Sequence, residues 1–205
     1  MAPPPFTLLD DQMHDAGAEK RALRARMRQT RKACAAAQPK ASMRLVEALA
    51  QAPVSDWRGR VVSVYLAEKS EIDPAPLAAH LAALGAIIVL PVVIAHGAPL
   101  IFRMAGRSAL TPDAVGMLAP GPDAPQLTPE IVLAPLLAFD PYGARLGQGG
   151  GFYDRTLAAL RGAGPVTAIG LAYAGQEVER LPVSPHDQYL DGVLTEEGYR
   201  AAFKP

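Results

Sequence analysis

The stretch FDPYGARLGQGGGFYDR, residues 139–155, decides how this chain is interpreted. It follows an apolar run, Ile131–Ala134, that is typical of a buried strand. It leads into a segment with helical spacing, Phe152–Arg161, that Gly162 ends. Four glycines between residues 147 and 151 leave backbone N–H groups unobstructed at the start of that helix. N–H groups aimed along a helix N-terminus form a cradle for an anion.

Neither common nucleotide-binding signature accounts for this loop. A Walker A loop ends in Gly-Lys-Ser/Thr, and no such ending is present. The dinucleotide-binding pattern, started at Gly147 and Gly149, requires a third glycine at position 152, where Phe152 stands. Taken alone, the loop is as typical of a structural turn as of an anion site.

Elsewhere, apolar β-branched runs predict strands, and helical spacing predicts helices between them. The predicted strands include residues 61–66, 86–93 and 166–173, and the predicted helices include residues 39–51 and 73–85. Strands that alternate with helices, several of them apolar throughout, predict an α/β fold. We expect a three-layer α/β/α sandwich with a mostly parallel central sheet. Residues 94–129 hold many Pro and Gly residues and predict a long excursion beside the site.

The N-terminal part predicts a leader followed by a basic helix. Residues 1–17 are expected to be disordered, because the Pro-rich start and the acidic cluster behind it bury little. A helix is predicted from near Ala18, in a single domain covering residues 18–205. Its arginines recur at intervals of three and four and so share one face: Arg21, Arg24, Arg28 and Arg31.

Composition excludes several classes of function. Twenty basic residues balance twenty acidic ones, whereas a nucleic-acid-binding protein usually carries a basic excess. A single cysteine, Cys34, excludes an internal disulfide framework and fits a reducing compartment. The longest apolar run, residues 86–95, is too short to span a membrane. We therefore expect a cytoplasmic protein, a monomer, with no membrane or nucleic-acid partner.

The whole string 139–155 resembles the signature of the 5-formyltetrahydrofolate cyclo-ligases, also called 5,10-methenyltetrahydrofolate synthetases. That family shows an apolar residue before Phe-Asp, then Arg-Leu-Gly-x-Gly-x-Gly-aromatic-Tyr-Asp at the same spacing. Four shorter segments agree in order, and the resemblance covers residues 18–198. These segments are Lys20–Arg24, Tyr65-Leu66 with Glu71-Ile72, Leu181-Pro182 with His186-Asp187, and Asp191–Glu196.

This resemblance implies an ATP- and Mg²⁺-dependent enzyme that converts 5-formyltetrahydrofolate, with or without a polyglutamate tail, to 5,10-methenyltetrahydrofolate. ADP and phosphate are released. A formamide oxygen is a poor leaving group, so ATP phosphorylates it before N10 of the folate attacks the carbon. Such a reaction requires alignment and charge neutralisation more than a protein nucleophile.

The resemblance also implies roles for individual residues. Lys20 and Arg145 are the catalytic residues, and Asp154 and Asp187 are the Mg²⁺ positions. The implied nucleotide contacts are Lys20, Arg21, Arg24, Arg145, Leu146, Gly147, Gln148, Gly149, Gly150, Gly151, Phe152 and Tyr153. The implied folate contacts are Leu66, Glu71, Gln148, Gly149, Gly150, Gly151 and Phe152.

Each role has a simpler structural alternative. The basic helix could be a solvated face, Arg145 could form a loop salt bridge, and Glu71 could be a surface charge. Asp154 could be an acidic residue favoured at a helix N-terminus by the helix dipole. Where many family members carry Arg, Lys or Tyr in the glycine loop, this chain has Gln148 and Gly150.

Two other functions stay open at this point. One is a cyclo-ligase-like paralogue that binds nucleotide or folate without turnover. The other is a nucleic-acid-binding module led by residues 20–32, which hold seven basic residues.

Overall fold

A seven-stranded sheet forms the centre of the protein, whose computed structural model describes residues 5–203 and the side chains of residues 17–203. The strand order is β11-β10-β9-β6-β1-β2-β3, and every pairing is parallel except those of the edge strands β11 and β3. The strands are β1 (Val61–Ser63), β2 (Ile87–Val92), β3 (Ile101–Met104), β6 (Ile131–Pro135), β9 (Thr167–Leu171), β10 (Gly192–Thr195) and β11 (Gly198–Ala201). The predicted α/β architecture with a mostly parallel sheet is confirmed.

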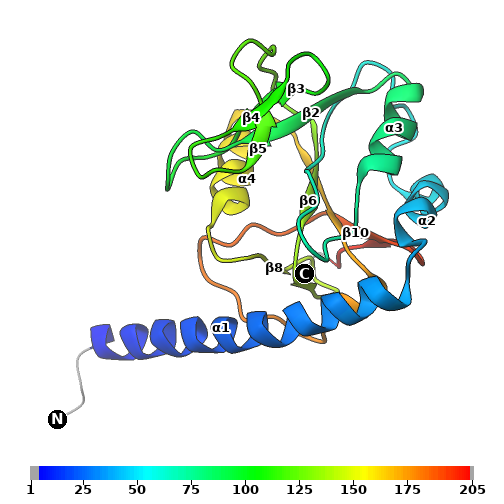
Figure 1. Ribbon diagram of the computed structural model, residues 1–205. Helices are drawn as coiled ribbons and strands as arrows, with labels where there is room; N and C mark the ends of the chain where they lie inside the picture. The colour runs from blue at the N-terminus through cyan, green and yellow to red at the C-terminus, as the bar shows by residue number, and fades with distance from the viewer. Residues whose placement is uncertain (1–4, 204–205) are drawn as a thin grey trace.

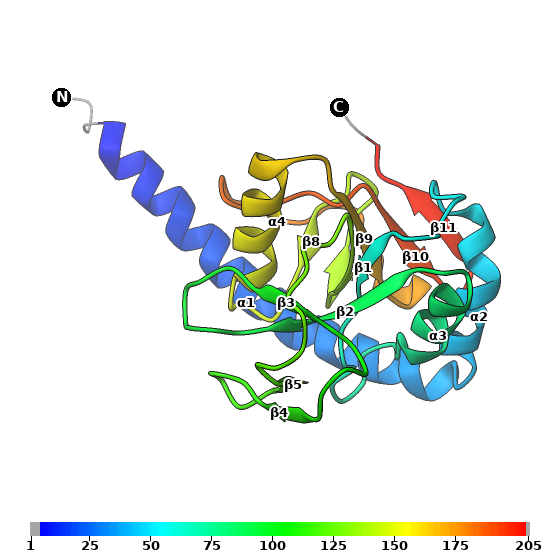
Figure 2. The same cartoon turned by 90° about the horizontal axis from the view of Figure 1, so that it is seen from above.

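Helices cover both faces of the sheet, as a parallel sheet requires. Figure 2 shows α4 (Phe152–Ala163) on one side, and α2 (Ala41–Ala48) and α3 (Ala75–Ala83) on the other. The central strand β6 is buried along its first four residues. Its apolar side chains therefore point alternately into two separate cores.

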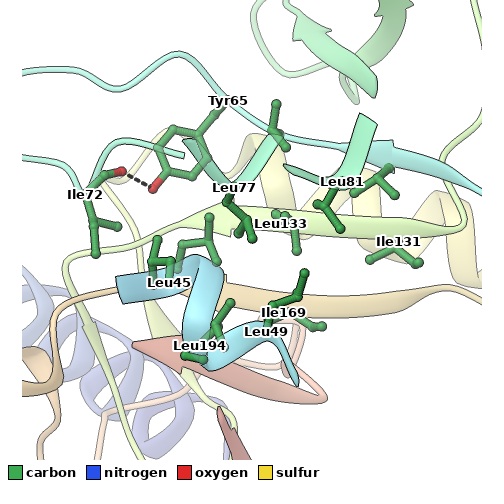
Figure 3. Close-up of a cluster of buried hydrophobic side chains, with 14 of the residues drawn as sticks. Leu45, Leu49, Tyr65, Ile72, Leu77, Leu81, Ile131, Leu133, Ile169 and Leu194 are labelled. Atoms are coloured by element: carbon green, nitrogen blue, oxygen red, sulfur yellow. Dashed lines mark hydrogen bonds between the residues drawn. The ribbon is translucent and has the colours of Figure 1, made fainter. Parts of the chain in front are cut away.

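The larger core lies between the sheet and the α2–α3 layer (Figure 3). Ile131 and Leu133 of β6 belong to it, together with Leu77 of α3. Val132 and Ala134 of the same strand point the other way, into a second core with Leu157 of α4. The register Leu133↔Ile169 between β6 and β9 aligns side chains of neighbouring strands on one face.

Helix α1 (Pro5–Ala37) runs along one end of the sheet, and its N-terminal half extends beyond the body of the molecule (Figure 1). The helix was expected from near Ala18, so its predicted start was wrong, and residues 5–17 of the expected leader are helical. Residues 1–4 lie outside the described residues. The division into a leader and one domain over residues 18–205 stays a prediction.

Three short elements in the 94–129 excursion and two strand pairs were not predicted. The excursion contains β3 and a hairpin of β4 (Leu110–Pro112) and β5 (Leu118–Pro120). A further pair, β7 (Ala138–Phe139) and β8 (Arg145–Leu146), precedes the glycine loop, and β10–β11 forms a pair over residues 192–201. Two short 3-10 turns, η1 (Leu49–Gln51) and η2 (Ala174–Gln176), complete the fold. Among the described helices, none is long and apolar enough to cross a membrane.

The α3 leucines offer a test of this packing. Leu77 is fully buried, whereas Leu84, at the C-terminal end of the same helix, is 44% exposed. We expect Leu77→Ala to lower the free energy of unfolding by about 2–5 kcal/mol, because it leaves a cavity in the larger core. Leu84→Ala should change it by less than about 1 kcal/mol. Urea titrations of both variants measure the difference, and equal losses would contradict this account of the core.

Candidate active site

A cavity of about 410 Å³ opens at the carboxyl ends of β1, β2 and β6. In open α/β sheets, ligands bind in the crevice outside the carboxyl ends of the strands. Separate parts of the chain form the walls, among them α1, the loop after β1, the ends of β2 and β6, the β4–β5 hairpin region, the glycine loop and the loop that contains Asp187. The cavity therefore depends on the folded arrangement of the whole sheet.

The glycine loop, residues 147–151, forms one wall and ends at the N-terminus of α4. Gly149 and Gly151 have φ values of +107° and +66°, a region that other residues rarely adopt. A Cβ atom at Gly151 would also lie 2.6 Å from Arg155 Nη1. Gly151 is the N-cap of α4 and supplies no side-chain cap, so the first N–H groups of the helix have no side-chain acceptor there. This wall suits an anion.

Behind the loop, Arg145 and Asp154 form a largely buried ion pair. Arg145 Nη2 donates to Asp154 Oδ1 at 2.9 Å, and Arg145 Nη1 donates to the carbonyl of Gln188 at 3.0 Å. The backbone N–H of Gln188 donates to the same Asp154 oxygen at 3.1 Å. Burial lowers the pKa of the Arg145 guanidinium, and the carboxylate of Asp154 opposes that shift. Arg145 stays charged because an arginine remains protonated in proteins.

A second ion pair joins α1 to the C-terminal part of the chain. Lys20 Nζ pairs with Asp187 Oδ2 and donates to Ser184 Oγ at 3.0 Å. The backbone N–H of Ser184 donates to the same Asp187 oxygen at 2.7 Å. Two of the residues predicted for the site thus contact each other across 167 positions of sequence.

The two carboxylates fit a magnesium ion. Both line the cavity, and each uses only Oδ1 (Asp154) or Oδ2 (Asp187) in the hydrogen bonds of the described residues. Mg²⁺ commonly takes one or two carboxylates and completes its shell with phosphate oxygens and water. The described residues contain no cluster of three or more His, Cys, Asp or Glu that could hold a metal without such help.

The basic face of α1 meets the glycine loop. Arg24 Nε donates to the carbonyl of Gly147 at 3.0 Å, and Arg28 donates through Nε and Nη2 to Gln148 Oε1 at 3.2 and 3.1 Å. Lys20 and Arg24 line the cavity, whereas Arg21 is exposed and lies outside its lining. One residue turns a helix by about 100°, so Arg21 points away from the direction of Lys20.

Glu71 is a cavity residue rather than a surface charge. Its side chain is 10% exposed and pairs with Arg31, whose Nη1 donates to Oε1 at 3.0 Å. The backbone N–H of Glu68 donates to Oε2 at 3.0 Å. The hydroxyl of Tyr65 donates to the carbonyl of Ile72 at 2.8 Å and fixes the other side of this loop (Figure 3).

All predicted site residues except Arg21 line the cavity. These are Lys20, Arg24, Leu66, Glu71, Arg145, Leu146, Gly147, Gln148, Gly149, Gly150, Gly151, Phe152, Tyr153, Asp154 and Asp187. Sequence patterns missed Asp113, Met117 and Leu118, which line it from the β4–β5 hairpin region. These residues lie in the Pro- and Gly-rich excursion of residues 94–129.

The model of the 5-formyltetrahydrofolate cyclo-ligase family matches residues 16–196. The chain belongs to this family. It is 36% identical over 140 residues to the 5-formyltetrahydrofolate cyclo-ligase of Escherichia coli (strain K12), which covers 65% of this chain and 76% of that protein. It is 35% identical over 147 residues to the cyclo-ligase of Mycolicibacterium smegmatis, covering 67% of this chain and 74% of that one.

Two solved structures share the fold of this cyclo-ligase family member. The 5,10-methenyltetrahydrofolate synthetase of Aquifex aeolicus has a TM-score of 0.67 at 23% identity, covering 93% of this chain and 94% of that one. The 5,10-methenyltetrahydrofolate synthetase of Mycoplasma pneumoniae has a TM-score of 0.65 at 22% identity, and the match covers 87% of this chain and 99% of that one. The family resemblance of residues 139–155 is confirmed, while the roles of the individual site residues stay predictions.

The buried pair predicts a structural effect that needs no ligand. Asp154→Ala should lower the free energy of unfolding by about 2–4 kcal/mol, because it leaves the buried Arg145 charge without its carboxylate. A matched control is Glu197→Ala, since Glu197 is 56% exposed and pairs with Arg200 at 2.9 Å. That exposed pair should contribute less than about 1 kcal/mol. Denaturant titrations measure both, and similar small losses would show that Arg145 does not depend on Asp154.

Proposed function

We propose that this protein catalyses the ATP-dependent cyclisation of 5-formyltetrahydrofolate to 5,10-methenyltetrahydrofolate, with release of ADP and phosphate. One observation carries the proposal. The side chains of Lys20, Arg145, Asp154 and Asp187 line the same cavity as a helix N-terminus that has no side-chain cap. Such a wall suits phosphate groups and a metal ion. The names of the E. coli and M. smegmatis relatives support the folate substrate.

The residues of the cavity divide between the two ligands. ATP would supply the phosphoryl group that turns the formyl oxygen into a leaving group, with Mg²⁺ offsetting the charge of its phosphates. Lys20, Arg24 and the N–H groups of residues 147–151 would hold those phosphates, and Asp154 and Asp187 would hold the metal. Lys20 would exchange Asp187 for a phosphate oxygen.

Arg145 would act as a fixed cation beside the phosphate that departs. Its position is set by Asp154 and by the carbonyl of Gln188. A charge that is already oriented stabilises the transition state without reorganisation. The apolar side chains of Leu66, Met117 and Leu118 line the same cavity and would exclude water from the reaction.

We also propose that the protein is a monomer that works in the cytoplasm.

The nucleic-acid alternative is weakened by the positions of the basic residues. Arg31 is buried, while Arg24 and Arg28 donate to the glycine loop, so these charges are engaged within the protein. The alternative of a paralogue that binds nucleotide or folate without turnover is distinguished from the main proposal by an activity assay.

The first test is the reaction itself. Purified protein with 5-formyltetrahydrofolate, ATP and Mg²⁺ should produce the methenyl chromophore together with ADP, and omitting ATP should prevent product formation. If both ligands bind in calorimetry and no product appears, the protein is the non-catalytic paralogue.

A second test concerns Lys20. Lys20→Ala should raise the KM for ATP about ten- to a hundredfold, the range of one lost charge-assisted phosphate contact, with little change in the KM for folate. Lys32→Ala is the matched control, because Lys32 is an exposed residue of the same helix outside the cavity lining. Steady-state kinetics separate the two constants. Equal increases for ATP and folate in the Lys20 variant would instead indicate a damaged cavity.

A further inference from the structure

Arg31 differs from the other basic residues of α1 in its surroundings. It is buried, and its side chain is 4% exposed. Its Nε donates to Ser70 Oγ at 3.2 Å and its Nη1 donates to Glu71 Oε1 at 3.0 Å. A buried charge is tolerated when it is paired and hydrogen-bonded, and Glu71 meets that condition.

The partner carboxylate is held from two directions. Arg31 holds Oε1 of Glu71 from α1, and the backbone N–H of Glu68 holds Oε2 at 3.0 Å. Two bonds to different oxygens fix the plane of the carboxylate. Each carboxylate oxygen accepts more than one hydrogen bond, so both retain acceptor capacity toward the cavity that Glu71 lines.

We infer that Arg31 is a positioning residue, which orients Glu71 to accept hydrogen bonds from the N–H groups of the folate ring system. The inference rests on the proposed function, because it concerns the folate end of that substrate. Arg31 lies outside the cavity lining and acts through Glu71. Arg31 would thus contribute to folate binding without touching the folate itself.

The position of Arg31 along α1 supports this division. Lys20 and Arg31 are eleven residues apart, which corresponds to about 16 Å along an α-helix. Lys20 and Arg24 serve the glycine loop and Asp187, whereas Arg31 serves the loop after β1. Glu71 also neutralises Arg31, so Arg31 does not add to the cations that attract phosphate. The same basic helix can thus supply cations to the phosphate groups and, through Glu71, a carboxylate to the N–H groups of the folate.

Binding measurements without turnover test the inference. Calorimetry of 5-formyltetrahydrofolate without ATP, and of ADP with Mg²⁺ without folate, would be run on Arg31→Gln, Glu71→Gln and the double variant. We expect Arg31→Gln to weaken folate binding about ten- to a hundredfold and ADP binding less than twofold. The double variant should bind folate no more weakly than Glu71→Gln alone, since Arg31 acts through that carboxylate.

Two controls separate positioning from stability. Arg31→Lys keeps the charge and loses the planar fork, so its folate affinity should lie between wild type and Arg31→Gln. Arg26→Gln, on an exposed position of the same helix, should change neither affinity. If Arg31→Gln does not fold, the lysine variant decides: a folate-specific loss of at least threefold supports the inference.

Other outcomes overturn it. Equal losses of folate and ADP affinity would make the pair a structural tie between α1 and the loop after β1. Unchanged folate binding in a folded Arg31→Gln or Arg31→Lys variant, or multiplied losses in the double variant, would show that Arg31 does not act through Glu71. Failure of the wild-type protein to bind 5-formyltetrahydrofolate would instead defeat the proposed function.

Discussion

The packing of α1 against the β7–β8 pair is the contact on which the position of the basic helix depends. Leu23 and Met27, one turn apart, pack against Leu137, Ala138 and Leu146. This apolar contact fixes the rotation of the helix about its axis. Rotation then decides which side chains face inward, because residues three and four apart share a face. The basic residues reach the cavity because two apolar neighbours hold the helix in that orientation.

Three ion pairs around the cavity differ in burial, and the difference suits their proposed tasks. Arg31–Glu71 is the most enclosed, Arg145–Asp154 is partly open on its acidic side, and Lys20–Asp187 is the most accessible. An enclosed pair is difficult to separate, since separation leaves a charge without solvent or partner. An accessible pair exchanges partners at lower free-energy cost. Under the proposed function, Lys20–Asp187 is the pair that exchanges partners when ATP binds, and its cation is the most exposed of the three.

Much of this arrangement could be predicted from the sequence, because local patterns carry it. The strands β2 and β6 are apolar throughout, and the glycine spacing before Phe152 predicts a loop that opens a helix. Arg21, predicted to contact the nucleotide, lies outside the cavity lining, and the sequence could not show this, since helical periodicity defines a shared face but not the direction in which that face points. Packing by Leu23 and Met27 supplies that direction.

Other features could not be predicted because they join distant segments. Arg31 and Glu71 are 40 positions apart, and nothing local to either predicts their pairing. The contribution of Met117 and Leu118 depends on how the β4–β5 hairpin folds beside the sheet. The short strands β10 and β11 obtain their order from pairing with β9 and with each other, rather than from a strong pattern of their own.

The contact between Lys20 and Asp187 has a consequence for synthesis on the ribosome. The helix with Lys20 leaves the exit tunnel well before Ser184, Asp187 and Gln188, which lie much later in the chain. A nascent chain can bury its early strands and helices, since folding generally proceeds from the N-terminal side during translation. It still lacks the wall that orients Arg145 and pairs Lys20. A product of premature termination before residue 184 would therefore lack β10 and β11 as well as this wall of the cavity.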